Sequence, residues 1–262
     1  MLFDLSIFLY MLSFVMIGFY LFFNNERFSF FAKLFAILGT LLNGIYLVMK
    51  WILLPSSLSG NISYILSLIT FILSLSAVIV VLRYKKISVL LFILPISIIF
   101  AIAAFFHQPL LLMRAYHLGF WLFVHLPLTI AGSSLFIVSA IFGIFYFIQE
   151  KQLKNKKFGF LYNVLPSLDI SNRINTSTMI TGFILFTGGL LSGFIWGIYE
   201  WEGKITFSPK LVFALITWFI FAMVIFIKKW KGLAPKGTAL ASIIGIISVI
   251  ITYVALAFFI KG

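Results

Sequence analysis

The chain has 262 residues, of which 63% are hydrophobic and only 10% are charged, and its mean hydropathy is +1.19. A soluble domain carries about 25% charged residues, so this composition excludes a water-soluble globular protein and indicates an integral membrane protein. The net charge of +13 is then a signal of topology and not of nucleic-acid binding, and the absence of cysteine excludes disulfides and thiolate metal sites.

Eight apolar stretches are long enough to cross the hydrocarbon core as helices, which takes about 20 residues each. They are continuously apolar, which favours helices over the alternating strands of a barrel. The first stretch begins beside Asp4 without a basic segment, so we expect no cleaved signal peptide. The sequence predicts one all-α, polytopic membrane helix bundle over residues 1–262, with about eight transmembrane helices at approximately Leu5–Phe23, Lys33–Leu53, Ile62–Leu82, Ile87–Phe106, Gly119–Ile148, Thr178–Tyr199, Pro209–Ile227 and Gly237–Ile260.

The basic residues divide unequally between the two sides of this predicted bundle. The connections after the first, third, fifth and seventh spans hold 14 of the 19 Lys and Arg residues, and the opposite side holds five. Because cytoplasmic loops are enriched in Lys and Arg, both termini are predicted to lie outside. We expect the protein to reside in a bacterial inner membrane.

Three histidines break the apolar pattern on the predicted outer side: His107, His117 and His125. His125 lies about two turns into the fifth span, where an imidazole needs a polar partner and can bind a metal or heme iron. His117 precedes it by eight residues and shares its helix face only if the helix begins by His117. For His107 and His117 the sequence favours the simpler interpretation, that they are loop residues at the lipid headgroups.

A second polar segment is the predicted outer loop WGIYEWEGKITFSP, between the sixth and seventh spans. It sets Glu200 and Glu202 among Trp196, Tyr199 and Trp201. Aromatic faces flanked by a few charges suit a flat, largely apolar ligand with polar edges. The same aromatic residues would also serve as anchors at the membrane interface.

The longest predicted connection runs over Gln149–Ser177 and begins with the basic run QEKQLKNKK. Its lysines are typical of a topology determinant that faces anionic lipid, and they would also suit a soluble cytoplasmic partner. In the sixth span, small residues between Gly182 and Gly193 predict close helix packing and no chemistry of their own.

Three stretches between about residues 90 and 262 carry a common pattern. GFWLFVHLPLTIAGSS contains a WL-x-x-H motif with its histidine at His125, and FIQEKQLKNKKFGFLYNVLPSL forms the long connection. GFIWG, SPKLVFALITW and KKWKG then follow in that order. The combination resembles the cytochrome c assembly family of membrane proteins, of the CcsA, CcmC and HemX type.

In that family the tryptophan-rich outer loop handles heme, and histidines on the outer face supply axial ligands while heme is presented to apocytochrome c. The resemblance implies that His125 ligates heme iron. It also implies that Trp196, Tyr199 and Trp201 belong to the heme-facing loop, and it leaves His117 as a candidate for a further ligand.

The chain departs from the family pattern at several positions. Ser208, Leu211 and Phe213 stand where the family has Asp, Glu and Trp, and Phe226 stands where it has a histidine. The histidine that the family places near the C-terminus has no counterpart before Gly262. The first interpretation is therefore binding or presentation of heme without turnover. Its partners would be apocytochrome c, the lipid bilayer and a second assembly subunit that completes the ligand set, with no nucleic acid.

An alternative interpretation is a HemX-like membrane regulator that does not bind heme itself. It would act through its cytoplasmic face, at Lys151–Lys157 and the LPSLD segment, on a soluble protein of tetrapyrrole synthesis. A small-molecule transporter is disfavoured, because no span carries a buried charged pair or a clear internal repeat.

Overall fold

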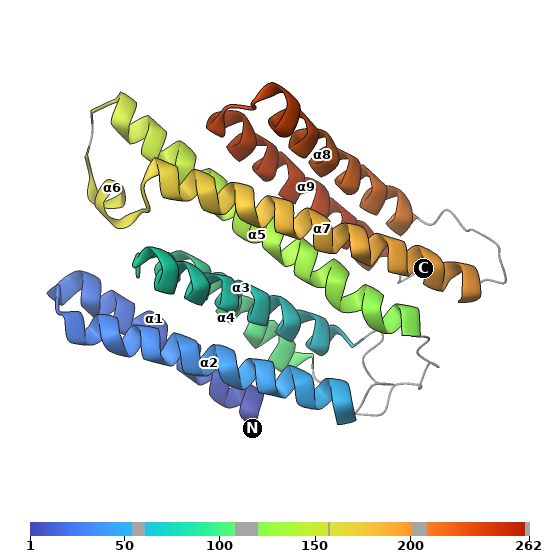
Figure 1. The fold of residues 1–262 in the computed structure, drawn as a ribbon. Helices are drawn as coiled ribbons and strands as arrows, with labels where there is room; N and C mark the ends of the chain where they lie inside the picture. Colours follow the sequence, from blue (N-terminus) through green and yellow to red (C-terminus); the bar gives the residue numbers. More distant parts are fainter. Residues whose placement is uncertain (54–60, 108–119, 157, 201–208, 260–262) are drawn as a thin grey trace. The chain divides into compact units, whose positions relative to one another are not determined.

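The computed structural model describes residues 1–53, 61–107, 120–156, 158–200 and 209–259, and every regular element in these ranges is a helix (Figure 1). Each predicted span corresponds to one long helix, which confirms the predicted helical membrane bundle. The helices are α1 (Leu2–Phe23), α2 (Glu26–Leu53), α3 (Ile62–Tyr84), α4 (Val89–Phe106), α5 (Phe120–Lys154), α6 (Phe160–Val164), α7 (Leu168–Glu200), α8 (Pro209–Lys231) and α9 (Pro235–Phe259).

In the described part of the chain, seven of these helices are long and apolar enough to cross a membrane. The eighth, α9, has 25 residues, of which Pro235–Ile250 is described in full and is apolar. The short α6 lies in the connection between α5 and α7. The chain divides into two compact units, Met1–Leu118 with α1–α4 and Gly119–Gly262 with α5–α9.

The first unit is an antiparallel bundle whose helices are joined by polar side chains. The Tyr10 hydroxyl of α1 lies 2.9 Å from the Ser74 hydroxyl of α3. Asn43 Nδ2 of α2 donates to the Ser67 carbonyl of α3 at 3.4 Å. In a membrane, each hydrogen bond between helices contributes only a modest free energy, but these bonds determine which helix faces meet. We call this set of buried polar residues the hydroxyl seam; it comprises Ser6, Tyr10, Ser13, Thr40, Asn43, Ser63, Ser67, Thr70, Ser74 and Ser97.

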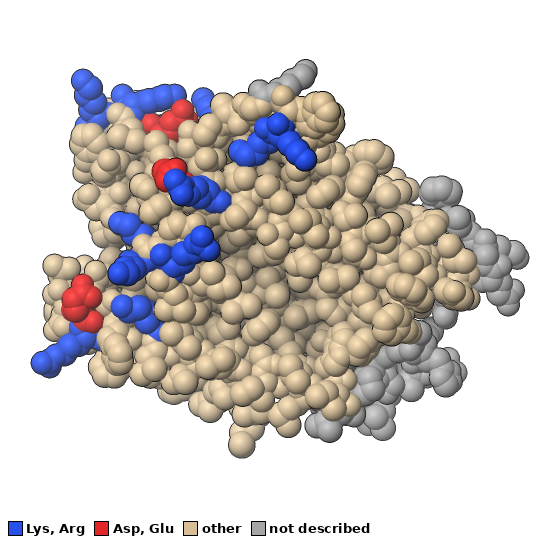
Figure 2. Space-filling model, viewed as in Figure 1, with Lys and Arg blue, Asp and Glu red and all other residues tan. Residues whose placement is uncertain are grey.

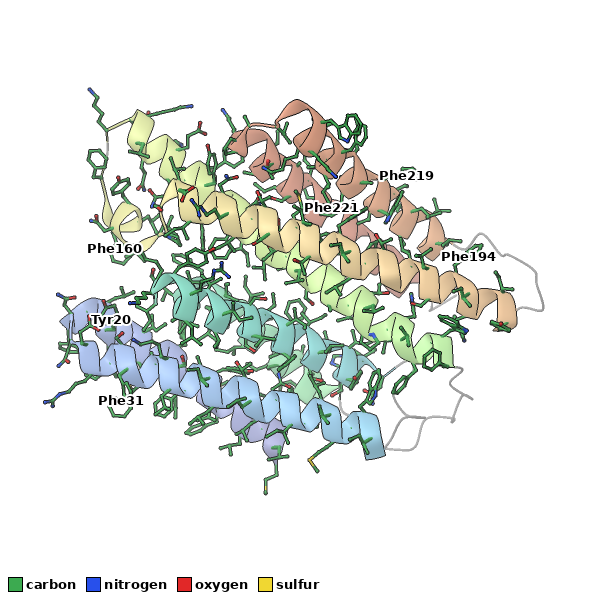
Figure 3. The ribbon with its side chains drawn as sticks, viewed as in Figure 1. Tyr20, Phe31, Phe160, Phe194, Phe219 and Phe221 are labelled. Atoms are coloured by element: carbon green, nitrogen blue, oxygen red, sulfur yellow. The ribbon has the colours of Figure 1, made fainter. Side chains whose placement is uncertain are left out.

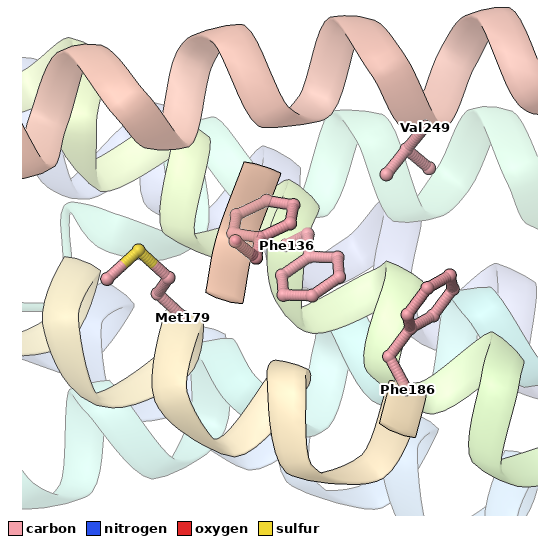
Figure 4. Packing of buried hydrophobic residues seen from close by; sticks show 5 residues of the cluster. Phe136, Met179, Phe186 and Val249 are labelled. Carbon is pink, nitrogen blue, oxygen red and sulfur yellow. The ribbon is translucent and has the colours of Figure 1, made fainter. Parts of the chain in front are cut away.

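The second unit is built around the α5–α7 pair, with α9 and α8 packed beside it. Its apolar core joins four helices, and Figure 4 shows its members from close by. Phe136 of α5 stacks on Phe221 of α8 with ring centroids 3.6 Å apart and planes only 6° from parallel. Met179 and Phe186 of α7 and Val249 of α9 close the cluster.

Helix α7 begins ten residues before the predicted start of its span, because one side of its polar first turns is buried inside the unit. Asn175 is 1% exposed and donates to the Ser139 carbonyl and to the Ser242 hydroxyl, each at 2.7 Å. The Ser139 hydroxyl donates in turn to the Asn175 carbonyl at 2.9 Å. This three-helix hydrogen-bond group holds α5, α7 and α9 together, so the polar sequence SNRINTST is helix and not connection.

Most of the described basic side chains lie at one end of the helices in each unit, as Figure 2 shows for the face in view, and Lys50 in the last turn of α2 is an exception. We call that end the basic end. In the first unit it holds the α1–α2 and α3–α4 connections, and in the second unit the α5–α7 and α8–α9 connections. Between the two ends the outer surface is apolar: Phe31, Phe194 and Phe219, labelled in Figure 3, are all exposed, as side chains that face lipid must be.

Candidate functional site

The candidate site centres on His125, in the second turn of α5, at the end of that helix far from its basic residues Lys151 and Lys154. The imidazole is partly buried, and its Nδ1 lies 2.6 Å from the carbonyl oxygen of Gly189 on α7. A carbonyl oxygen can only accept a hydrogen bond, so Nδ1 carries the proton. In the neutral ring, Nε2 then holds the lone pair that a metal ion can accept.

Two hydroxyls fix the surroundings of this hydrogen bond. Thr129 Oγ1 donates to the backbone carbonyl of His125 at 2.8 Å and lies 3.3 Å from its Nδ1. Ser192 Oγ donates to the same Gly189 carbonyl at 2.9 Å. The imidazole is therefore held from its own helix by Thr129 and from α7 by a carbonyl that Ser192 also engages.

Glycine permits this contact, because α5 and α7 approach too closely here for a side chain. A Cβ atom added at Gly189 would lie 2.8 Å from the backbone nitrogen of Thr129, and one at Gly193 would lie 2.6 Å from Cε1 of His125. Such distances are shorter than real Cβ contacts. The segment GLLSG that ends at Gly193 thus brings α7 against the imidazole in the manner of a small-xxx-small helix contact. The predicted close packing of this span is what places the site.

Sequence reasoning did not assign Thr129, Gly189, Ser192 or Gly193 to the site. The spacing of small residues did point to the two glycines, but it predicted close helix packing and not a part in the site. No local pattern could have shown that the opposing residue is His125, because that depends on the register of α5 against α7.

The aromatic residues predicted for the same site lie farther along α7. Trp196 follows Gly193 by three residues, which places it about one turn nearer the end of the helix on a neighbouring face, and its side chain is partly buried. Tyr199 lies close to the end of α7 and is 75% exposed. Trp201 and His117 lie outside the described residues, so the part of the loop that would face a ligand is represented here by Trp196 and Tyr199.

Two other predicted positions lie on other helices. His107 caps α4 in the first unit, where its exposed ring contacts the Ala103 carbonyl of its own helix at 2.9 Å. Phe226, at the position of a family histidine, is 59% exposed and stacks on Trp230 at the basic end of α8.

Among the described residues, no group of three His, Cys, Asp or Glu side chains could hold a metal ion. A bare metal ion would therefore lack ligands there. An iron in a porphyrin brings four nitrogen ligands of its own and needs only axial donors from the protein. His125, with its proton on Nδ1 and the lone pair on Nε2, fits that requirement.

Comparison with known proteins identifies relatives of the whole second unit. The family described as Cytochrome C assembly protein matches residues 58–262, a range that begins before the predicted resemblance at about residue 90. The chain is similar to proteins named cytochrome c biogenesis protein CcsA. That of Guillardia theta is 28% identical over 54% of this chain and 52% of its own length, and that of Welwitschia mirabilis is 36% identical over 41% and 37%.

A longer match extends into the first unit. The cytochrome c biogenesis protein CcsA of Prochlorococcus marinus strain MIT 9515 is 24% identical over 89% of this chain and 83% of its own length. In the matches to the Guillardia and Welwitschia proteins, the chain spans about half or less of the relative.

Proposed function

Since the chain belongs to the cytochrome c assembly protein family, we propose that it binds heme through His125 and presents it at the end of the bundle opposite the basic end, in the biogenesis of cytochrome c. The observation that carries this proposal is the 2.6 Å contact between His125 Nδ1 and the Gly189 carbonyl. The predicted topology places that end of the second unit outside the cell.

Histidines that bind metals regularly donate their other ring N–H to a carbonyl or carboxylate, which orients the ring and makes the ligating nitrogen more basic. His125 has this arrangement, and Thr129 adds a second contact from its own helix. When bound, heme supplies the iron and four of its ligands. The residues of this chain orient the imidazole and fix its tautomer.

The aromatic residues support a flat ligand beside the histidine. Trp196, partly buried about one turn beyond Gly193, offers an indole face near the end of α7, and Tyr199 is exposed at the same end. Stacking on such faces suits a porphyrin, whose rings are apolar. The second axial ligand would come from His117 or from a partner subunit.

The proposal is tested by the absorption of the purified protein. The full chain is expressed with ample heme supply and purified in detergent, and its Soret band is compared with that of the His125→Ala variant. We expect the wild type to carry heme and the variant to lose most of it. The matched control is His107→Ala, which removes an exposed histidine that contacts only its own helix in the described structure and should leave the Soret band unchanged.

A wild-type protein that stays free of heme under these conditions contradicts heme binding, and the HemX-like regulator would then be the better interpretation. Full heme retention by His125→Ala contradicts His125 as the ligand. Both variants are checked for helical content and monodisperse elution, so that loss of heme is not confused with loss of fold.

A further inference from the structure

The connection between α5 and α7 exposes apolar side chains where a polar loop would be expected. Phe158 is 58% exposed, Phe160 63% and Leu161 38%. Figure 3 labels Phe160 on the short helix α6. Exposed clusters of large apolar groups mark surfaces that contact protein or membrane.

These side chains are presented in a fixed orientation. Gln149 of α5 donates from Nε2 to the carbonyl oxygens of Tyr162 and Leu165, at 3.0 Å and 3.4 Å. Val164 and Leu165 are buried, and the Phe158 ring packs edge-on against Tyr162 with centroids 4.8 Å apart. The C-terminal end of α6 is thus attached to the unit, while Phe158, Phe160 and Leu161, which we call the apolar face, remain exposed.

The segment that carries this apolar face is basic. The last turn of α5, the connection and the first turns of α7 together hold five basic and two acidic residues. Both acidic residues already pair within their own helices: Glu150 with Lys154 at 2.8 Å, and Asp169 with Arg173 at 2.9 Å. Lys151 and Lys156 are exposed, so the positive charge that exceeds these two pairs is available to anionic groups outside the chain.

The position of the connection identifies what supplies these groups. It joins the ends of two membrane-spanning helices, so it lies where the bilayer meets water. At the same end of the unit, Trp230 is 73% exposed and directly follows Lys228 and Lys229. Tryptophan and lysine together at a helix end are typical of an interfacial anchor, and basic segments with apolar side chains bind anionic membrane surfaces.

We propose that Phe158, Phe160 and Leu161 insert into the interface of the membrane that the second unit spans, and that the lysines beside them bind the headgroups of anionic phospholipids. The α5–α7 connection is thereby a lipid-binding element. It shares no residue with the His125 site, so a test of this proposal does not depend on whether the protein binds heme.

The chain contains no cysteine, so one introduced cysteine is a unique labelling site. The full chain carrying Leu161→Cys is spin-labelled and reconstituted in vesicles of phosphatidylcholine alone, or of phosphatidylcholine with phosphatidylglycerol. Collisions of the label with oxygen, which concentrates in lipid, are compared with collisions with a water-soluble nickel chelate. The matched control is a label at Asn155→Cys, an exposed polar position of the same connection.

In vesicles with phosphatidylglycerol we expect the oxygen-to-nickel accessibility ratio at position 161 to exceed the ratio at position 155 severalfold. The K151Q, K154Q and K156Q triple variant changes only exposed side chains, so it should keep the fold. It should reduce the ratio at position 161 in anionic vesicles and have little effect in neutral ones.

Equal ratios at the two positions in anionic vesicles would overturn the proposal, because the apolar face would then be in water. Protection of position 161 that requires a soluble cell fraction would also overturn it and would indicate a protein partner. Insensitivity to the triple variant in anionic vesicles would overturn the role of the lysines.

Discussion

Polar side chains join helices in both units, but the units differ in how closely their helix backbones approach. In the first unit, side-chain hydroxyls and amides such as those of Tyr10, Asn43 and Ser67 lie between the helices. In the second unit, α5 and α7 meet directly at Gly189 and Gly193. Polar side chains tolerate small shifts of a helix, because a hydroxyl can turn to another carbonyl. A glycine contact leaves less room for such a shift, and it occurs where the His125 imidazole contacts the Gly189 carbonyl.

The largest expected difference in stability between the two units comes from Gly189→Ala in the second unit. The added Cβ would meet the backbone of Thr129, which cannot turn away, so α5 and α7 must separate. We expect the free energy of unfolding to fall by about 2–3 kcal/mol, measured by denaturant titration in mixed micelles. Gly18→Ala in α1 is the control, since a Cβ there meets nothing within 4 Å. Equal losses of unfolding free energy in Gly189→Ala and Gly18→Ala would contradict the expected difference between the two units.

Replacing the buried asparagines by leucine, which is of similar size, compares the polar contacts of the two units. Asn175→Leu loses bonds to Ser139 and Ser242 and should cost about 1–2 kcal/mol of unfolding free energy. The Oδ1 of each asparagine is buried without a hydrogen-bond partner among the described residues, and Asn43→Leu loses one 3.4 Å bond. We expect it to change stability by less than about 0.5 kcal/mol. A larger loss of unfolding free energy in Asn43→Leu than in Asn175→Leu would show that the polar contacts of the hydroxyl seam contribute more to stability.

Gly193→Ala tests whether the glycine contact serves His125 and not packing alone. The added Cβ would push the imidazole from its place beside the Gly189 carbonyl. If the proposed function holds, heme affinity should fall about tenfold, read from a Soret titration. At the adjacent Gly188 an added Cβ meets only Leu128 Cδ1, at 3.4 Å, so Gly188→Ala should bind heme as the wild type does. An unchanged affinity in Gly193→Ala would remove this glycine from the site.

A small effect, comparable with that of Asn43→Leu, is expected from Tyr10→Phe in the hydroxyl seam. It removes the contact with Ser74 and keeps the ring against Gly39, so the unfolding free energy should fall by about 0.5 kcal/mol. Heme binding should be unchanged. A loss larger than that of Asn175→Leu would mean that the first unit depends on this one hydroxyl pair.

The helices were predictable because a membrane imposes a simple rule on sequence, and each apolar stretch became one helix. The start of α7 was not predictable by that rule. Asn175 is polar, and its burial depends on Ser139 and Ser242, which lie far away in the chain. The hydroxyl seam was missed for the same reason, although Ser63, Ser67, Thr70 and Ser74 recur at steps of three and four residues along α3.

The sequence singled out the central residue of the candidate site but not the contacts that support it. His125 stood out as an imidazole inside an apolar helix, and the family resemblance singled out the same residue. The contacts that orient it come from Gly189 and Ser192 on another helix. Which carbonyl an imidazole meets depends on how two helices are aligned, and the sequence of either helix alone does not contain that alignment.

The hydroxyl seam also bears on how the protein is made. Several of its side chains donate within their own helix: Ser6 to the Phe3 carbonyl at 2.6 Å, Thr40 to that of Ala36 at 2.8 Å. A serine or threonine that is hydrogen-bonded within its own helix needs no partner from another helix. A helix whose hydroxyls are bonded in this way can therefore pass from the translocon into the bilayer with few unpaired polar groups. The seam then forms by lateral association in the bilayer. Its polar groups select neighbours only after insertion, at little cost to insertion itself.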